Sequence, residues 1–457
     1  MTSCRVARAL KHTRTEFEGY TEERYESDDP PGGNGAKTNG HNTNTGADTD
    51  GAPWPIMAPA AYHGLAGEAV SVIAPYTEAD RIALHLHFLA SFGNAVGRGP
   101  HYLVEATSHF ANLFLVTIGR TSRARKGTGA DWISCIFKIA DPHWANDCTH
   151  SGMSSGEGML TPIRDPVYAM RKGVEELIDP GVEDKRMLLD EREFSQVLRV
   201  MRREGNVVSR MVRDAWDCRA VIGTLTKHTH TKVTKAYISI IGHITAEELR
   251  NLLDQTEVFN GFANRFLLAC VRRDKLLPHG GAPSAELIEK LGLKTLQAIE
   301  AARPIERVTM TTEAAGFWEK IYPMLSKDQP GLLGAITARA EAQTIRLALI
   351  YALLDGSPQI AQVHLEAAQA VWTFCEDSAR YVFGDLVGEA FTDEVLRVLR
   401  SAGSSGMTCI DLYQIFIGHR SKDKITTALI RLLAAGKVRR EQRPGSRGLA
   451  GEMWFAV

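Results

Sequence analysis

Residues 119–128, G-R-T-S-R-A-R-K-G-T, combine glycine, hydroxyl and basic side chains as a triphosphate-binding loop requires. Such a loop surrounds phosphates with backbone N–H groups, a lysine that reaches the outer phosphates and a hydroxyl that binds Mg²⁺. The usual spacing is G-x-x-x-x-G-K-S/T, whereas here Lys126 lies seven residues after Gly119 and Gly127 separates it from Thr128. A solvated basic turn is the alternative. The predicted nucleotide-binding residues are Gly119, Thr121, Ser122, Arg125, Lys126, Gly127 and Thr128.

An acidic cluster follows the apolar run 185–190. Asp190, Glu191 and Glu193 at the end of a buried strand are typical of the acids that hold Mg²⁺ through water and polarise an attacking water. We therefore predict Asp190, with Thr128, as a metal residue and the three acids as catalytic. The alternative is the N-terminus of a helix, where the helix dipole favours acids.

A third apolar run, 236–243, ends in Gly-His-Ile-Thr. We expect a polar side chain there to lie beside the acidic strand and to sense the γ-phosphate, and His243 and Thr245 are the candidates. Thr245 is also predicted to cap the helix that begins A-E-E-L, because Glu248 completes a capping box.

One arginine has the setting of a residue that reaches a nucleotide from a neighbouring subunit. Arg265 stands between a polar loop and an apolar run in N-G-F-A-N-R-F-L-L, as expected of an arginine finger supplied to a neighbouring subunit. Such a finger implies a homo-oligomer. A structural arginine paired with a carboxylate is the alternative.

The segment 226–235, T-K-H-T-H-T-K-V-T-K, predicts a basic β-hairpin directly before the third strand. Lys227, Lys232 and Lys235 could contact a nucleic-acid backbone, although a solvated hairpin is the alternative. The pairs His228/His230 and His85/His87 have no carboxylate or cysteine at ligand spacing, so we do not expect metal at either.

The candidate site residues can act together only if helices and strands bring them close in space. Residues 112–118 predict a buried strand and 129–140 a helix, which give the strand, loop and helix order that a phosphate loop needs. Residues 78–96 predict a mostly buried helix with Thr77 as its N-cap. The expected fold is α/β, a P-loop NTPase core (RecA/AAA+-like) with a parallel sheet, a helical lid and a C-terminal winged helix.

The C-terminal segment has its own pattern. Helices are predicted at 392–400, 408–418 and 421–435, followed by strands at 437–442 and 452–455, the order of a winged helix. Residues 391–457 hold eight Arg and three Lys against three Asp and three Glu, a net charge of about +5. We predict phosphate contacts for Lys422, Lys424, Arg443 and Arg447, with protein docking as the alternative.

The chain as a whole, by contrast, has a formal net charge of −1 and a pI near 7.0, so no global field attracts it to nucleic acid or membrane. Its seven cysteines are scattered and never in C-x-x-C spacing, which argues against disulfides or structural zinc. No signal peptide or long apolar run is present, so we expect a cytoplasmic protein.

The first residues differ in composition from the rest. Residues 26–53 contain almost no side chain able to pack, and we expect them to be disordered. The predicted organisation is a charged or disordered segment at 1–53, a helical N-terminal subdomain at 54–110, an NTPase core at 111–275, a helical lid region at 276–388 and a winged helix at 389–457.

Residues 54–385 resemble a bacterial and phage- or plasmid-borne domain family of unknown function found in primase–helicase-like proteins. The resemblance rests on W-P at 54–55, A-Y-H-G-L-A-G-E at 61–68, P-Y-T-E-A-D at 75–80, the loop 119–128, S-G-M-S-S-G-E-G at 151–158, I-I-G-H-I-T at 240–245 and N-G-F-A-N-R-F at 260–266. In that family the loop is taken as a P-loop variant. The sequence departs from the family at Gly129, where a serine is expected.

Residues 338–352 also resemble the lid helix of ring-forming AAA+ helicases of the minichromosome-maintenance type. The resemblance implies that Arg339 reaches a nucleotide phosphate, with Arg346 as a second candidate. An amphipathic helix with salt-bridged arginines is the alternative.

Together these features predict an ATP- and Mg²⁺-dependent, helicase-like motor of mobile-element DNA replication. Its expected partners are DNA, a primase or other replication protein, and further copies of itself in a ring, with no membrane. A DNA-binding regulatory or docking protein with an inactive nucleotide site is one alternative. An NTP-dependent defence or partition ATPase without unwinding is another.

Overall fold

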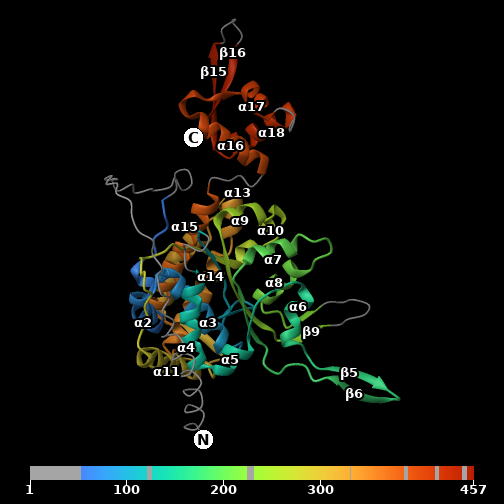
Figure 1. Cartoon of the computed structure of the whole chain (residues 1–457), viewed down its shortest axis with the longest axis vertical. Coiled ribbons are helices and arrows are strands. Elements are labelled where there is room, and N and C mark those ends of the chain that lie inside the picture. The colour runs from blue at the N-terminus through green and yellow to red at the C-terminus, as the bar shows by residue number, and fades with distance from the viewer. Residues whose placement is uncertain are drawn as a thin grey trace, which may run out of the picture. The chain divides into compact units, whose positions relative to one another are not determined.

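The central sheet has five strands, all parallel, in the order β11-β3-β10-β7-β4. Helices lie on both sides of it (Figure 1). The computed structural model describes residues 53–120, 126–223, 231–329, 331–384, 390–416, 421–444 and 450–457. The predicted α/β architecture with a parallel sheet is confirmed, and so are the three predicted strands. The bounds are β3 (Phe114–Ile118), β4 (Thr149–His150), β7 (Arg186–Glu191), β10 (Tyr237–Ile244) and β11 (Phe266–Cys270).

The register of the sheet brings the predicted functional segments to one edge. Ile118 of β3 pairs with Ile244 of β10, and Gly242 of β10 pairs with Glu191 of β7. Because parallel strands end at the same edge, the loop after β3 and the acids of β7 lie on either side of the end of β10.

One face of the sheet is covered by α3 (Arg81–Val96), α4 (Lys126–Ala140) and the helices behind them. Leu115, Leu188 and Ile241 share a hydrophobic core with residues of these helices. The remaining helices of this layer are α2 (Gly64–Ile73), α11 (Ala285–Ala302), α12 (Thr312–Leu325), α14 (Ala340–Leu354) and α15 (Gln362–Phe383). Helices from the predicted N-terminal and lid regions therefore share this core with the sheet.

The opposite face packs against α7 (Phe194–Met201) and α8 (Val208–Trp216) in a second core that includes Phe114 and Ile240. Alternate residues of the same strands thus enter different cores, as expected for a sheet buried on both faces. Also on this side are α6 (Gly156–Leu160), α9 (Ala246–Leu252), α10 (Gln255–Phe259) and α13 (Gly331–Thr337). Among the described helices, none is both long and apolar enough to cross a membrane.

The predicted N-cap of α3 was wrong. The helix begins at Arg81, and the Asp80 side chain accepts the Ile82 N–H at 2.9 Å. Thr77 instead accepts the Ala79 N–H within the preceding turn. Both residues are good caps in isolation, and the turn decides between them.

Smaller sheets surround the central one. A four-stranded sheet has the order β13-β12-β1-β2, and two hairpins, β5–β6 and β8–β9, follow α6 and α8. The bounds are β1 (His101–Val104), β2 (Thr107–Phe110), β12 (Arg307–Met310), β13 (Gln359–Ile360), β5 (Val167–Arg171), β6 (Val174–Asp179), β8 (Val221–Gly223) and β9 (Lys232–Thr234). Of the hairpin predicted at 226–235, residues 226–230 lie outside the described residues, and β9 pairs with β8, which precedes the predicted segment.

The C-terminal segment forms three helices and a three-stranded antiparallel sheet of order β14-β16-β15. The helices and the two longer strands fall where they were predicted, and their own core includes Leu396, Leu429 and Trp454. The bounds are α16 (Ala390–Ala402), β14 (Met407–Thr408), α17 (Cys409–Ile415), α18 (Lys422–Ala434), β15 (Val438–Pro444) and β16 (Ala450–Ala456).

A buried arginine joins three elements of the central fold. Arg346 of α14, 2% exposed, donates from Nη1 to Asn112 O at 3.0 Å and Oδ1 at 2.6 Å, and from Nη2 to Trp216 O at 2.8 Å. Its guanidinium lies 3.6 Å from the centroid of the Trp216 ring. Burial lowers the pKa of Arg346 to about 10, so the group stays charged at neutral pH.

We predict that Arg346→Ala lowers the free energy of unfolding by about 3 kcal/mol or more, because it leaves buried carbonyls unpaired and opens a cavity. Urea unfolding followed by circular dichroism measures this loss. Arg199→Ala, at an exposed position of α7, is the matched control and should change stability by less than about 0.5 kcal/mol. Equal stabilities of the two variants would contradict the prediction.

Candidate functional site

The predicted phosphate loop connects β3 to α4 at the carboxyl edge of the sheet. Gly119 N donates to Ile244 O at 3.1 Å, so the chain leaves β3 beside the end of β10. Helix α4 begins at Lys126, which confirms the predicted order of strand, loop and helix. Thr121, Ser122, Arg125 and the side chain of Lys126 lie outside the described residues. Thr128 is exposed in the first turn of α4, where helix N-termini favour anions.

Gly129, where the family resemblance led us to expect serine, packs tightly in this fold. A Cβ added there would lie 3.2 Å from Cβ of Ala79 and 3.6 Å from Cδ2 of Leu84. The turn before α3 therefore approaches the first turn of α4 too closely for a larger residue to fit without displacement. Close packing therefore accounts for glycine in place of serine at position 129.

Asp190 lies in β7, near its end, and faces the α4 side of the sheet. It lines a cavity together with Ala130 and Ile133 of α4. Its Oδ1 is buried and has no partner among the described residues, whereas Oδ2 lies 3.4 Å from Nε of Arg192. Burial raises the pKa of Asp190 despite Arg192, so a nearby cation would favour the ionised form.

Glu191, the last residue of β7, faces the opposite side and is 5% exposed. Its carboxylate accepts the backbone N–H groups of Met153 at 2.7 Å and Gly152 at 3.2 Å. It therefore anchors the segment 151–158, which the sequence alone did not connect to it. Its catalytic role stays a prediction.

The other polar residues at this edge have distinct settings. Glu193 is exposed at the N-cap position of α7, and its side chain does not cap the helix. Thr245 caps α9 in a capping box with Glu248, as predicted. His243 is 4% exposed on β10, level with Thr117 of β3, and its ring stacks on that of His87 at 5.2 Å between centroids.

A cleft of about 620 Å³ opens beside the acids. It is lined by 149–154, which form β4 and the segment after it, by 190–193 at the end of β7, and by Gln196 and Arg203. Its volume falls in the range of small-molecule sites, about 300–1,000 Å³. The acids thus border a space that can admit a ligand.

Arg265 and Arg339 lie at the amino-terminal edge of the sheet, and the structure brings them together. Arg265 directly precedes β11 and pairs with Asp217 at 2.8 Å, which is the ion pair that the structural alternative expected. Arg339 Nε donates to Asn264 Oδ1 at 2.9 Å. Their guanidiniums lie 5.5 and 5.0 Å from the Trp216 ring that also holds Arg346.

The predicted nucleic-acid contacts are partly described. Lys232 and Lys235 are exposed at the β8–β9 hairpin, and Lys422 and Lys424 are exposed in the first turn of α18. Lys227, Arg447 and the side chain of Arg443 lie outside the described residues, as do His228 and His230.

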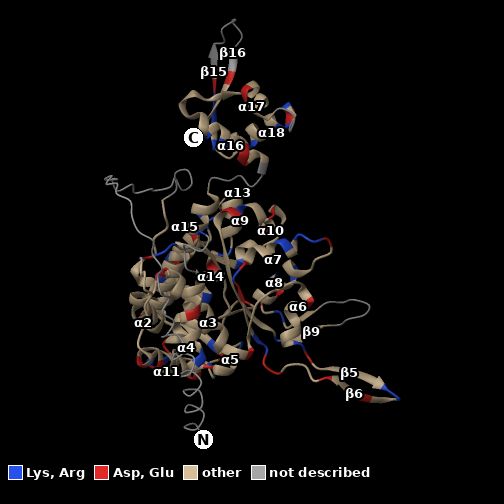
Figure 2. Ribbon diagram, viewed as in Figure 1, with Lys and Arg blue, Asp and Glu red and all other residues tan. Residues whose placement is uncertain are grey.

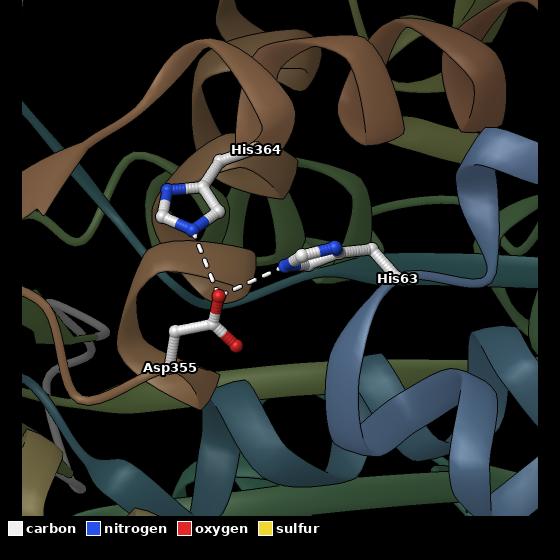
Figure 3. Close-up of side chains that lie close together, drawn as sticks. All are labelled: His63, Asp355 and His364. Carbon is white, nitrogen blue, oxygen red and sulfur yellow. Dashed lines mark hydrogen bonds and ion pairs between the residues drawn. The ribbon is translucent and has the colours of Figure 1, made fainter.

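A histidine cluster that the sequence did not predict joins α2, α14 and α15. His63 Nε2 and His364 Nε2 lie 2.8 and 3.1 Å from the same oxygen, Asp355 Oδ2 (Figure 3). The spacing resembles a metal site, but His364 Nδ1 accepts the Ala361 N–H at 2.9 Å. Neutral His364 must therefore carry its proton on Nε2, which leaves no lone pair there for a metal.

The second cluster of this kind is His143, Cys148 and Asp184. Burial, followed by the charge of Asp184, raises the pKa of the Cys148 thiol to about 12, and Asp184 is already bound by Arg186 at 2.6 Å. A protonated thiol beside a paired carboxylate is a poor metal ligand. Both clusters are explained by contacts within the protein.

No model of a known protein family matches the chain, and no curated protein matches it.

We predict that His364 makes the protein less stable in acid. Burial lowers the pKa of His364, so below about pH 6.5 the unfolded chain binds a proton that the folded protein does not. Stability from this residue is present above that pH and is lost as the pH falls toward the folded pKa. In His364→Gln, whose side chain can also accept the Ala361 N–H, the free energy of unfolding should fall less between pH 7.5 and pH 5.

Urea unfolding at the two pH values measures this difference. His279→Gln, at an exposed position, is the control and should keep the wild-type dependence. An unchanged pH dependence in His364→Gln would contradict the prediction.

Proposed function

We propose that the protein is an ATP-hydrolysing, helicase-like motor of mobile-element DNA replication. The observation that carries this proposal is the convergence of three segments at one edge of a parallel sheet. The loop 119–128 leads into helix α4, β7 ends in Asp190-Glu191, and β10 carries His243 at its next-to-last position between them. Strand β10 lies between β3 and β7. An anion bound at the N-terminus of α4 would therefore lie across the end of β10 from the acids of β7.

Each residue at this edge has a proposed role that suits its chemistry. Lys126 and the backbone N–H groups at the start of α4 would bind the phosphates. Thr128 and Asp190 would hold Mg²⁺, and the unpartnered buried oxygen of Asp190 suits that role because burial disfavours its charge without a cation. When bound, Mg²⁺ would neutralise charge on the phosphates. His243 would sense the γ-phosphate, and Glu191 or Glu193 would orient water.

Arg265 and Arg339 support an oligomeric form of this motor. Three arginines surround Trp216 and only Asp217 offers them an ion pair among the described residues, so positive charge is in excess at this edge. A structural salt bridge to Asp217 needs only one arginine. The phosphate of a nucleotide bound to a neighbouring subunit would balance the remaining positive charge. We therefore place Arg265 and Arg339 at the subunit interface of a ring.

The C-terminal segment would bind DNA as a winged helix. Three helices precede the β15–β16 hairpin, and the segment has a net charge of about +5. Elsewhere Lys and Arg alternate with Asp and Glu over the visible helices (Figure 2). Local charge at Lys422 and Lys424, rather than a global field, would attract the DNA backbone.

We predict that Lys126→Ala lowers the kcat of ATP hydrolysis about 100-fold or more, because the outer phosphates lose their cation, and that Asp190→Asn does the same by weakening Mg²⁺ binding. Phosphate release with and without single-stranded DNA measures this activity. Lys138→Ala, exposed on the same helix, is the matched control. ATP turnover at the wild-type rate in Lys126→Ala would refute the assignment of the site.

The same proteins separate the alternative functions. A DNA-binding regulatory protein with an inactive nucleotide site would bind DNA without ATP, keep that binding in Lys126→Ala and lose it when residues 391–457 are deleted. A defence or partition ATPase would hydrolyse ATP but fail to separate forked DNA strands.

We predict that Arg339→Ala lowers ATP hydrolysis about 1,000-fold and that it does so in trans. If Arg339 reaches the nucleotide of a neighbouring subunit, mixing Arg339→Ala with Lys126→Ala restores activity, because some interfaces join an intact arginine to an intact loop. Activity is measured over a range of mixing ratios. Mixtures no more active than the sum of the two variants would contradict action across an interface.

A further inference from the structure

His87 on α3 is a buried histidine that neither the sequence nor the proposed reaction explains. It is 1% exposed, and both ring nitrogens lack a hydrogen-bond partner among the described residues. Burial, followed by the charge of Arg192, lowers the pKa of His87 to about 4, so the ring is neutral at physiological pH. An unpaired buried polar atom lowers the stability of the fold, and a phenylalanine would avoid that loss.

The neighbouring His85 has a hydrogen-bond partner at one ring nitrogen, whereas its Nδ1 has none among the described residues. Its Nε2 lies 2.8 Å from the hydroxyl of Tyr351, on the side of α3 that faces α14. His85 and His87 are two positions apart and so point to different sides of the helix. Only His87 faces the sheet edge that carries the proposed site.

A cavity of about 160 Å³ lies beside His87, between α3, α4 and the sheet. Its polar lining includes Ser91 of α3, Ser134 of α4, Thr149 of β4 and Asp190 of β7. Of these lining residues, Asp190 is the one whose Oδ1 has no partner among the described residues. A space of this volume with several polar groups accommodates ordered water, which needs two to four polar partners.

His87 also contacts the other polar residue at the end of the sheet. Its ring is parallel to that of His243, with 1° between the planes and 5.2 Å between the centroids. His87 therefore borders both the strand that would sense the phosphate and the cavity that contains the acid of the metal site.

We propose that His87 is a positioning residue that orients the Asp190 carboxylate through water held in this cavity. A neutral imidazole can donate to one water and accept from another, so it can complete a chain of hydrogen bonds to Asp190 Oδ1. Phenylalanine can stack on His243 but cannot form that chain. The consequence for catalysis rests on the proposed function, whereas the water bridge does not.

The first test is kinetic. In the full chain, His87→Phe keeps the aromatic stack and should lower kcat about 10-fold to 100-fold with the KM for ATP changed less than about twofold. His87→Asn restores one donor and one acceptor and should recover part of kcat. His85→Phe is the matched control on the same helix, and it should lower thermal stability but leave kcat unchanged.

Wild-type kcat in His87→Phe would overturn the proposal. Equal losses of kcat in the Phe and Asn variants, with equal losses of thermal stability, would assign His87 a packing role and overturn it as well.

The second test does not depend on activity. A crystal structure of the full chain should contain water within hydrogen-bonding distance of both the His87 ring and Asp190 Oδ1, and a dry cavity would overturn the proposal. If the wild-type protein does not hydrolyse ATP but the bridging water is present, the proposed function fails while the positioning of Asp190 by His87 is supported.

Discussion

The buried guanidinium of Arg346 is the contact on which the arrangement of the central sheet depends. It binds carbonyls at the start of β3 and the end of α8, two segments more than 100 residues apart, through 3.0 Å and 2.8 Å hydrogen bonds. An aliphatic residue would fill the same space, but it would not fix the register of these backbones. The planar donors of arginine satisfy several fixed acceptors at once, and Trp216 replaces part of the lost hydration. The buried charge of Arg346 contributes more to the specificity of the fold than to its stability, because a buried ion loses much of its hydration energy.

Once β3 is placed, the opposite edge of the sheet follows from the geometry of parallel strands. The pairing of β3 with β10, and of β10 with β7, puts the loop, His243 and the acids at nearly the same level. Glycine makes this packing possible, because a Cβ at Gly242 would lie 2.6 Å from the Phe194 ring. The helix that follows the acids can therefore lie directly on the strand that separates them from the loop.

Local signals predicted part of this structure and could not predict the rest. The runs 112–118, 185–190 and 236–243 are apolar enough to identify as buried strands, and Thr245 with Glu248 forms a capping box within four residues. Strand β4 has two residues and offers no pattern. The bond from Met153 to Glu191 joins positions 38 apart, and the meeting of Arg265, Arg339 and Arg346 needs the whole fold. Asp is the more favourable N-cap type, and Asp80 caps α3, whereas the predicted cap Thr77 accepts a hydrogen bond in the preceding turn.

Two pairs of nearby residues differ in how far their buried polar atoms are satisfied. Glu191 is buried and fully engaged by two backbone N–H groups, whereas its neighbour Asp190 keeps one buried oxygen without a partner among the described residues. His85 is bonded to Tyr351, whereas His87, two residues later, is not bonded to any described residue. In each pair the member with fewer hydrogen bonds borders the cavity beneath α4, although His85 also keeps Nδ1 without a partner among the described residues. Folded proteins tolerate such violations mainly where function requires them, because each lowers stability. The cavity is therefore better explained as part of the proposed site than as a defect in packing.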